Sequence, residues 1–116
     1  MATFSRLLLS ASTNGKPVQA TASATPGTTI HTAVTGTTSY DEVYAWVTNS
    51  TAAPITLTIE WGGTTANTDH MCTSLSIPAN SPPIPIVTGQ VLQNGLLFRA
   101  FCSGYLQFTG YVNRIA

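Results

Sequence analysis

The side chains that could carry out chemistry in this chain are few, and their spacing does not combine them into a reactive site. The chain has two histidines, His31 and His70, two cysteines and four carboxylates. The pattern nearest to a reactive constellation is Asp69-His70 followed by Cys72. Adjacent residues of a strand point to opposite faces, so Asp69 and His70 would diverge, although His70 and Cys72 could share a face. Because a nucleophilic site also needs a base and an orienting group, we predict no catalytic residues and a protein that is not an enzyme.

Cofactor and metal sites are also not indicated by the sequence. Metal binding requires three or four converging donors, and the histidines, Cys72, Glu60 and Asp69 show no ligand spacing such as CxxC or HxxxH. There is no phosphate-binding loop, dinucleotide fingerprint or Asp-rich calcium loop, and the glycines occur singly or in pairs, as in turns. We therefore predict neither a metal nor a cofactor.

Charged residues are rare in this chain. Asp, Glu, Lys and Arg make up 7% of the residues, against roughly a quarter in a typical soluble domain, while the hydrophobic share of 43% is ordinary. Little charge is left to keep copies apart, which favours assembly with other protein surfaces. The net charge is zero and the four basic residues are scattered, so we expect no nucleic-acid binding.

The apolar run at residues 7–9 is too short for the core of a signal peptide and far too short to span a bilayer. We expect synthesis in a cytoplasm and no membrane association. In that compartment Cys72 and Cys102 are expected to be reduced thiols packed as small apolar groups, with a single disulfide as the alternative.

Short segments rich in Val, Ile, Thr, Tyr and Phe alternate with turn residues, which predicts an all-β chain. In residues 54–61, Ile55, Leu57, Ile59 and Trp61 share a core face, and Thr56, Thr58 and Glu60 a wet face. In residues 42–48 both faces are apolar, so this strand is either central or faces a partner. The last segment places Leu106, Phe108 and Val112 opposite Tyr105, Gln107, Thr109, Tyr111 and Asn113.

Further strands are predicted at residues 96–102 and, more weakly, at 6–10, 18–23, 28–34 and 71–77. The four prolines within residues 78–85 exclude a central strand there and indicate an extended connection or a covered edge. The total of eight or nine short strands in 116 residues predicts a single antiparallel β-sandwich domain over residues 1–116, of jelly-roll or immunoglobulin-like topology.

The aromatic residues suggest a binding surface. Rings on an exposed sheet face could stack on a sugar, but protein interfaces also favour Tyr and Trp and exclude charge. We predict protein contact, with carbohydrate binding as the alternative. The predicted interface anchors oppose apolar strand faces and are Tyr44, Trp46, Tyr105 and Tyr111.

Three segments also resemble a known family. Residues 27–46 (GTTIHTAVTGTTSYDEVYAW), together with 55–63 (ITLTIEWGG) and 110–115 (GYVNRI), are similar to the small cement or decoration proteins that coat the capsids of tailed bacteriophages. The resemblance covers most of the chain through strand and turn segments. It implies a jelly-roll or similar β-sandwich that binds the outside of a capsid and bridges neighbouring copies of the major capsid protein, often as a dimer or trimer.

From these observations we expect a non-enzymatic virion structural protein that is made in the host cytoplasm and located on the capsid exterior. The alternatives are a head-fibre or tail component and a carbohydrate-binding sandwich for surface attachment. Residues 1–6 and 113–116 are candidates for arms or added edge strands that pair with a neighbouring subunit, since sheet edges offer unpaired backbone groups. Frayed termini are the simpler interpretation of the same segments.

Overall fold

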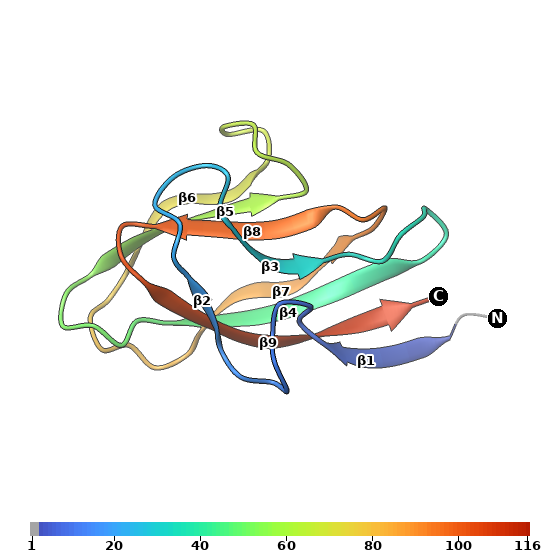
Figure 1. Cartoon of the computed structure of the whole chain (residues 1–116), viewed down its shortest axis with the longest axis horizontal. Coiled ribbons are helices and arrows are strands. Elements are labelled where there is room, and N and C mark those ends of the chain that lie inside the picture. The colour runs from blue at the N-terminus through green and yellow to red at the C-terminus, as the bar shows by residue number, and fades with distance from the viewer. Residues whose placement is uncertain (1–2) are drawn as a thin grey trace.

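The computed structural model describes residues 3–116, and in this part of the chain nine strands and no helix form (Figure 1). Within the described range, therefore, no helix has the length and apolar character needed to cross a membrane. The strands are β1 (Phe4–Leu8), β2 (Val18–Ala20), β3 (Thr28–Thr32), β4 (Tyr40–Thr48), β5 (Ile55–Trp61), β6 (His70–Ile77), β7 (Ile84–Leu92), β8 (Leu97–Cys102) and β9 (Leu106–Ile115).

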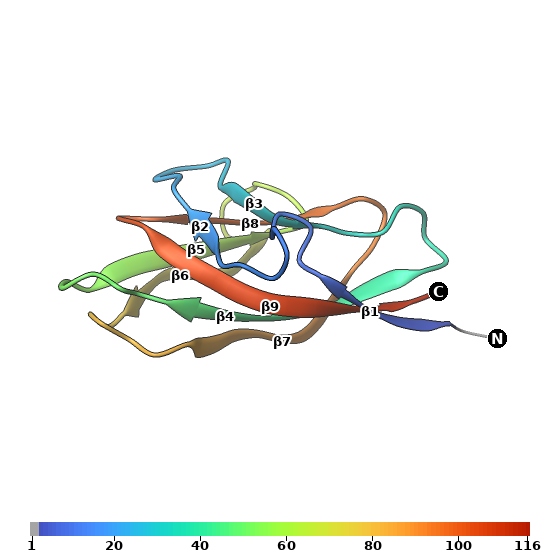
Figure 2. The same cartoon turned by 60° about the horizontal axis from the view of Figure 1, so that its bottom comes forward.

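The strands form two antiparallel sheets packed face to face. Sheet A has the order β1-β9-β4-β7, with β2 pairing β9 further along the same side, and sheet B has the order β3-β8-β5-β6. Figure 2 shows the two layers, with β4 and β7 on one side and β3 and β8 on the other. The prediction of an all-β chain folded as an antiparallel β-sandwich is confirmed.

The pairing of the strands is nested. β5 pairs β6, β4 pairs β7, β3 pairs β8 and β2 pairs β9, so each pair encloses the previous one in sequence. Successive pairs fall alternately into sheet B and sheet A. This is the arrangement of one long hairpin, centred on the β5–β6 connection, that has been wrapped around a common core.

The core lies between the sheets and follows the predicted alternation. On β4 the side chains of Val43, Ala45 and Val47 are fully buried, and β5 contributes Ile55, Leu57 and Ile59 to the same core. The rings of Phe98 and Phe108 meet edge to face across the two sheets, with centroids 6.0 Å apart. Burying each such side chain stabilises the fold by about 1.5–3 kcal/mol.

The predicted wet face of β5 is wrong for two of its three residues. Thr58 and Glu60 are buried, and Glu60 has an exposed fraction of 0%. At Glu60 the reason is that the segment 21–27 folds over this face: Thr25 Oγ1 and the Gly27 amide donate to the Glu60 carboxylate over 2.5 and 2.7 Å. Thr58 instead accepts from the Ser74 amide of β6. Gly27 permits the contact, because a Cβ there would lie 2.7 Å from the Ala100 backbone.

The proline-rich segment joins the two sheets, and its last part is a strand. β7 begins at Ile84 and places Pro85 opposite Trp46 at the edge of sheet A. An edge strand tolerates proline because a backbone donor is needed on only one side. The exclusion of a central strand from residues 78–85 is therefore confirmed, although β7 itself was not among the predicted strands. β4, between β9 and β7, is interior to its sheet.

Candidate interaction surface

The outer face of sheet A carries a cluster of three aromatic side chains, which we call the aromatic cluster: Tyr44 and Trp46 from β4 and Tyr111 from β9. The register pairs Tyr44 directly with Tyr111, and the two rings stack with centroids 5.1 Å apart and an interplanar angle of 21°. Trp46 packs beside Tyr111 with a centroid distance of 6.1 Å. All three side chains are only half-buried. The cluster therefore presents ring surface to the exterior on a rigid two-strand support.

Polar groups beside the cluster satisfy one another. The Arg6 guanidinium lies 4.5 Å from the centre of the Tyr111 ring, and Arg6 Nε donates to Asn113 Oδ1 over 3.4 Å. Glu42 Oε1 accepts from the Tyr44 hydroxyl at 3.0 Å and from Asn113 Nδ2 at 3.4 Å. The hydrogen bond to Glu42 raises the pKa of Tyr44, which keeps the phenol neutral. One positive and one negative side chain thus flank the rings, and their charges balance locally.

Apolar side chains extend this surface beyond the rings. Leu8, opposite Tyr111 on β1, is 51% exposed, and Val91, opposite Glu42 on β7, is 52% exposed. Phe4 is 63% exposed and faces Ile115, which in turn faces Tyr40. We call the outward side of β1, β9, β4 and β7 the open face. The register arranges its residues in two apolar rows, Phe4–Ile115–Tyr40 and Leu8–Tyr111–Tyr44, and the polar row Arg6–Asn113–Glu42 lies between the two and ends at Val91.

Of the four predicted anchors, the structure brings three together and leaves one apart. Tyr105 precedes β9 in the turn after β8 and is 55% exposed. Among the ring contacts of residues 3–116, none involves Tyr105. Arg6, Glu42 and Asn113 were not among the predicted anchors. The sequence signal that could have found them is their position two residues from an aromatic residue on the same strand face.

The terminal segments pair with each other within the chain. The Thr3 amide donates to the Ala116 carbonyl at 2.6 Å, and the Ala116 amide donates to Thr3 at 2.9 Å. β1 continues this pairing along β9 from Phe4 to Leu8. The idea that residues 3–6 and 113–116 extend as free arms is therefore corrected, because their backbone groups on the shared side are already satisfied. Residues 1 and 2 of the predicted arm lie outside the described residues.

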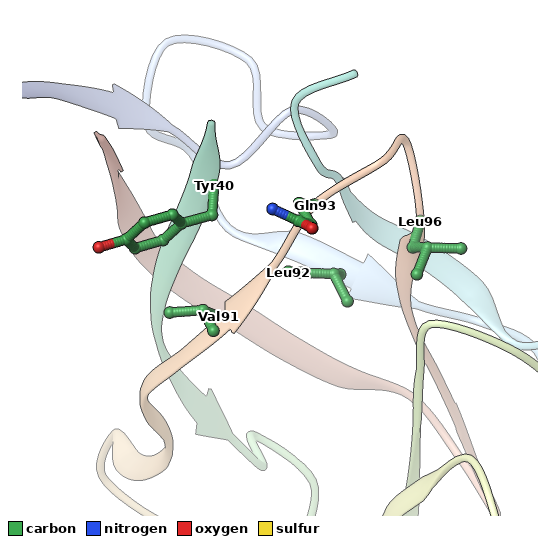
Figure 3. A pocket seen from close by; sticks show the side chains of 5 residues that line it. All are labelled: Tyr40, Val91, Leu92, Gln93 and Leu96. Atoms are coloured by element: carbon green, nitrogen blue, oxygen red, sulfur yellow. The ribbon is translucent and has the colours of Figure 1, made fainter. Parts of the chain in front are cut away.

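A shallow apolar pocket of about 420 Å³ lies beside the open face (Figure 3). It is lined by Tyr40, Val91, Leu92, Gln93 and Leu96. The Gln93 amide donates to the backbone carbonyls of Thr37 and Ser39, so the one amide in the lining is engaged with the 37–39 loop. Apart from the Tyr40 hydroxyl and the Gln93 amide the lining is apolar, so the pocket has the chemistry to receive an apolar side chain.

Among the residues that sequence reasoning considered for chemistry, His31 and Asp41 meet in a buried cluster, whereas Asp69, His70 and the two cysteines have separate partners. Asp69 lies in the turn before β6 and accepts from the Thr65 amide, whereas His70 begins β6 and contacts Thr73, so the two side chains have different partners. Cys72 and Cys102 are free thiols, as expected, and burial raises the pKa of both. In residues 3–116, no group of three or more His, Cys, Asp or Glu side chains converges as a metal site would.

One buried ionic cluster links the two sheets, and the sequence analysis did not predict it. Asp41 on β4 is buried and accepts from Arg114 Nε at 2.7 Å and from His31 Nε2 at 2.8 Å. His31 lies on β3 and Arg114 on β9. Despite burial, the hydrogen bonds from Arg114 and His31 leave the pKa of Asp41 below its usual value. The Asp41 and His31 side chains lie in the interior, on the side of sheet A opposite the open face, and the Arg114 side chain is 32% exposed.

Comparison of the chain with protein-family models, with curated proteins and with solved structures gave no match. The class of protein is therefore defined by its own architecture: an antiparallel β-sandwich with one aromatic outer face.

Proposed function

We propose that this protein is a non-enzymatic virion structural protein, a capsid cement protein that binds the outer capsid surface through its open face. In this role it clamps neighbouring subunits of the major capsid protein and itself associates as a dimer or trimer. The observation that carries the proposal is the open face, where the aromatic cluster and the exposed apolar residues form one surface with balanced charge. The capsid itself, as the partner, comes from the family resemblance of residues 27–46, 55–63 and 110–115.

Aromatic rings and few charges are the composition that protein interfaces favour at their centre. Arg6 and Glu42 both hydrogen-bond to Asn113. An interface that closes over them would therefore not bury a charge without a hydrogen-bond partner. A capsid presents many identical sites, so modest contacts suffice when neighbouring clamps also hold each other. The open face thus fits a protein that acts in many copies.

The nested strand pairing supports a finer interpretation of the fold. We infer a jelly-roll topology, with β2–β9 as its eight strands and β1 as an addition to the edge, because a jelly roll consists of two Greek keys in two sheets. An immunoglobulin-like sandwich is the alternative. Jelly rolls are frequent among viral capsid and lectin domains, so this topology agrees with the first candidate function and with the second one.

The second candidate is a carbohydrate-binding sandwich, which the parallel rings of Tyr44 and Tyr111 favour. Those rings stack on each other, however, and the Arg6 guanidinium occupies a face of Tyr111. A sugar would have to displace Arg6 to stack there, whereas a protein side chain can pack around it. The same face would also serve a head-fibre or tail component.

The test is co-sedimentation of the purified protein with capsids that lack it, together with a glycan array on the same preparation. We expect saturable binding in a fixed ratio to the major capsid protein and no signal on the array. Binding to glycans without binding to capsids would replace the cement proposal by the carbohydrate-binding one. Binding to isolated tails or fibres only would favour the other virion role. Light scattering after size exclusion measures the oligomeric state.

A further inference from the structure

His31 is a buried histidine with both ring nitrogens engaged, and its two contacts belong to different parts of the fold. Its exposed fraction is 1%. A bulge between Thr29 and His31 on β3 turns both Ile30 and His31 into the interior. Nε2 lies 2.8 Å from Asp41 Oδ2, and Nδ1 accepts the backbone amide of Ser10 at 3.0 Å. Because Nδ1 accepts a hydrogen, the ring proton belongs on Nε2, where it is donated to the Asp41 carboxylate.

Ser10 begins the short segment that fastens β1 to the rest of the sandwich. Besides its amide bond to His31, Ser10 accepts at Oγ from the Thr32 amide at 2.6 Å, and the Ala11 amide donates to the Ile30 carbonyl at 3.2 Å. These bonds join residues 10–11, which follow sheet A's first strand, to β3 of sheet B. β1 itself is poorly buried, with exposed side chains at Phe4, Ser5, Arg6 and Leu8. Apart from its pairing with β9, β1 is held to the sandwich by the residues that follow it.

We propose that His31 is an acid-sensitive latch: a second proton on its ring breaks the Ser10 bond, releases residues 10–12 and loosens β1 from β9. An imidazolium carries hydrogens on both nitrogens, so Nδ1 could no longer accept the Ser10 amide, and two donors would face each other in the interior. Opening this segment lets the charged ring reach water while Asp41 keeps its bonds from Arg114. The latch is independent of the proposed capsid role.

The surroundings of His31 set the direction of the effect. The charged groups that contact this cluster are Asp41 from β4 and Arg114 from β9, while β8 pairs Phe98 with His31 and the 10–12 segment offers Ser10. Burial lowers the pKa of His31, outweighing the Asp41 contributions that raise it. A lowered pKa means that the closed state binds the proton less readily than the open state. The closed latch is therefore fully stable above the ordinary histidine pKa of about 6.5 and is weakened as pH falls below it.

The experiment is amide hydrogen exchange of the full chain at about pH 7 and about pH 5, with rates corrected for intrinsic exchange. We expect protection at Ser10, Ala11 and the β1 amides to fall at least about tenfold at the lower pH, while the β4 amides 43–47 keep theirs. The chain has two histidines, so His70→Gln is the matched control and should retain the full pH step. His31→Gln has no titrating group at position 31 and should show no pH step in protection.

An unchanged step in His31→Gln, or its loss in His70→Gln, would overturn the proposal. If His31→Gln does not fold, the wild-type protein decides the matter by NMR. The His31 ring and the Ser10 amide should then titrate together with one midpoint below the ordinary histidine value. A Ser10 amide that stays protected while the His31 ring takes up its second proton would refute the latch.

Discussion

The outer faces of the two sheets differ in how far the chain itself shields them from solvent. On sheet B the chain covers part of its own surface: the segment 21–27 lies over the Glu60 end of β5, where Thr25 and Gly27 bond to the Glu60 carboxylate. On sheet A, residues 3–116 provide no such cover for the aromatic cluster, whose rings are half-buried by their neighbours alone. A fixed buried carboxylate needs its own donors, whereas rings tolerate water on one side. The contrast supports the proposal that a partner binds at the open face, where it could add contacts without disturbing the fold.

The largest effect should come from removing the Glu60 carboxylate, which holds the segment 21–27 against sheet B. Glu60→Ala deletes the acceptor of two charge-assisted hydrogen bonds and leaves the Gly27 amide without a partner. We expect the free energy of unfolding to fall by about 3 kcal/mol, measured by urea denaturation. Binding to capsids, measured at a temperature where the variant is folded, should remain unchanged. A loss of binding without a loss of stability would reverse the roles assigned to the two faces.

A change at the centre of the open face should show the opposite pattern. Tyr111→Ala removes the ring that contacts Tyr44, Trp46 and Arg6. We expect capsid binding to weaken by about 2 kcal/mol, or about thirtyfold, because central aromatic residues dominate interface energies. The loss of stability should be smaller, about 1 kcal/mol, since the ring pair adds only modestly to its buried area. Quantitative co-sedimentation and urea denaturation of the same preparation separate the two effects, and wild-type affinity would contradict the assignment.

Glu42→Gln is the open-face counterpart of the Glu60 substitution. The amide oxygen can still accept from the Tyr44 hydroxyl, so stability should change by less than about 0.5 kcal/mol. The pKa of Tyr44 should fall back toward its ordinary value, because the carboxylate that raises it is gone. Ultraviolet titration of the tyrosines measures this shift. A stability loss as large as that of Glu60→Ala would show that the two carboxylates have equivalent structural roles.

The smallest effect is expected at Tyr105, which gives the matched control for the aromatic cluster. It is exposed and lies in a turn outside the ring contacts. Tyr105→Ala should alter both stability and capsid binding by less than about 0.5 kcal/mol, as is usual for surface substitutions. The same two assays apply. Weakened binding here with normal stability would extend the interface from the open face to the β8–β9 end of the sandwich.

The parts of the fold that sequence reasoning predicted are those set by local alternation. The buried series Val43, Ala45 and Val47 has a period of two, and this period alone indicates a strand and its inward face. The burial of Glu60 could not be predicted in this way, because it depends on a segment more than thirty residues earlier that folds across the strand. The alternation within a strand predicts to which face a side chain points, but whether that face is exposed to solvent depends on other parts of the chain.

The aromatic cluster was predictable as a set of residues but not as a set of contacts. Alternation placed Tyr44, Trp46 and Tyr111 on outward faces, yet their stacking depends on the register that sets Tyr44 opposite Tyr111. Register arises from the packing of both sheets, which a single sequence does not display. Tyr105 fitted the same alternation, but β9 begins only at Leu106, so a turn orients it instead. The start of β9 therefore explains why Tyr111 belongs to the aromatic cluster and Tyr105 does not.

The nested strand pairing also has a consequence for the order of folding. β5 and β6 are neighbours in sequence and need only the residues 62–69 to turn between them, whereas β2 must find β9 near the other end of the chain. Loop closure becomes more costly as the paired strands lie further apart in sequence, so we expect the β5–β6 hairpin to form early and the pairs that β9 makes with β2 and β1 to close last. Substitutions in the hairpin should then slow folding, while those in β2 should mainly accelerate unfolding. The middle of the chain would then set the folding rate, and the strands near its ends would set the unfolding rate and so the lifetime of the folded state.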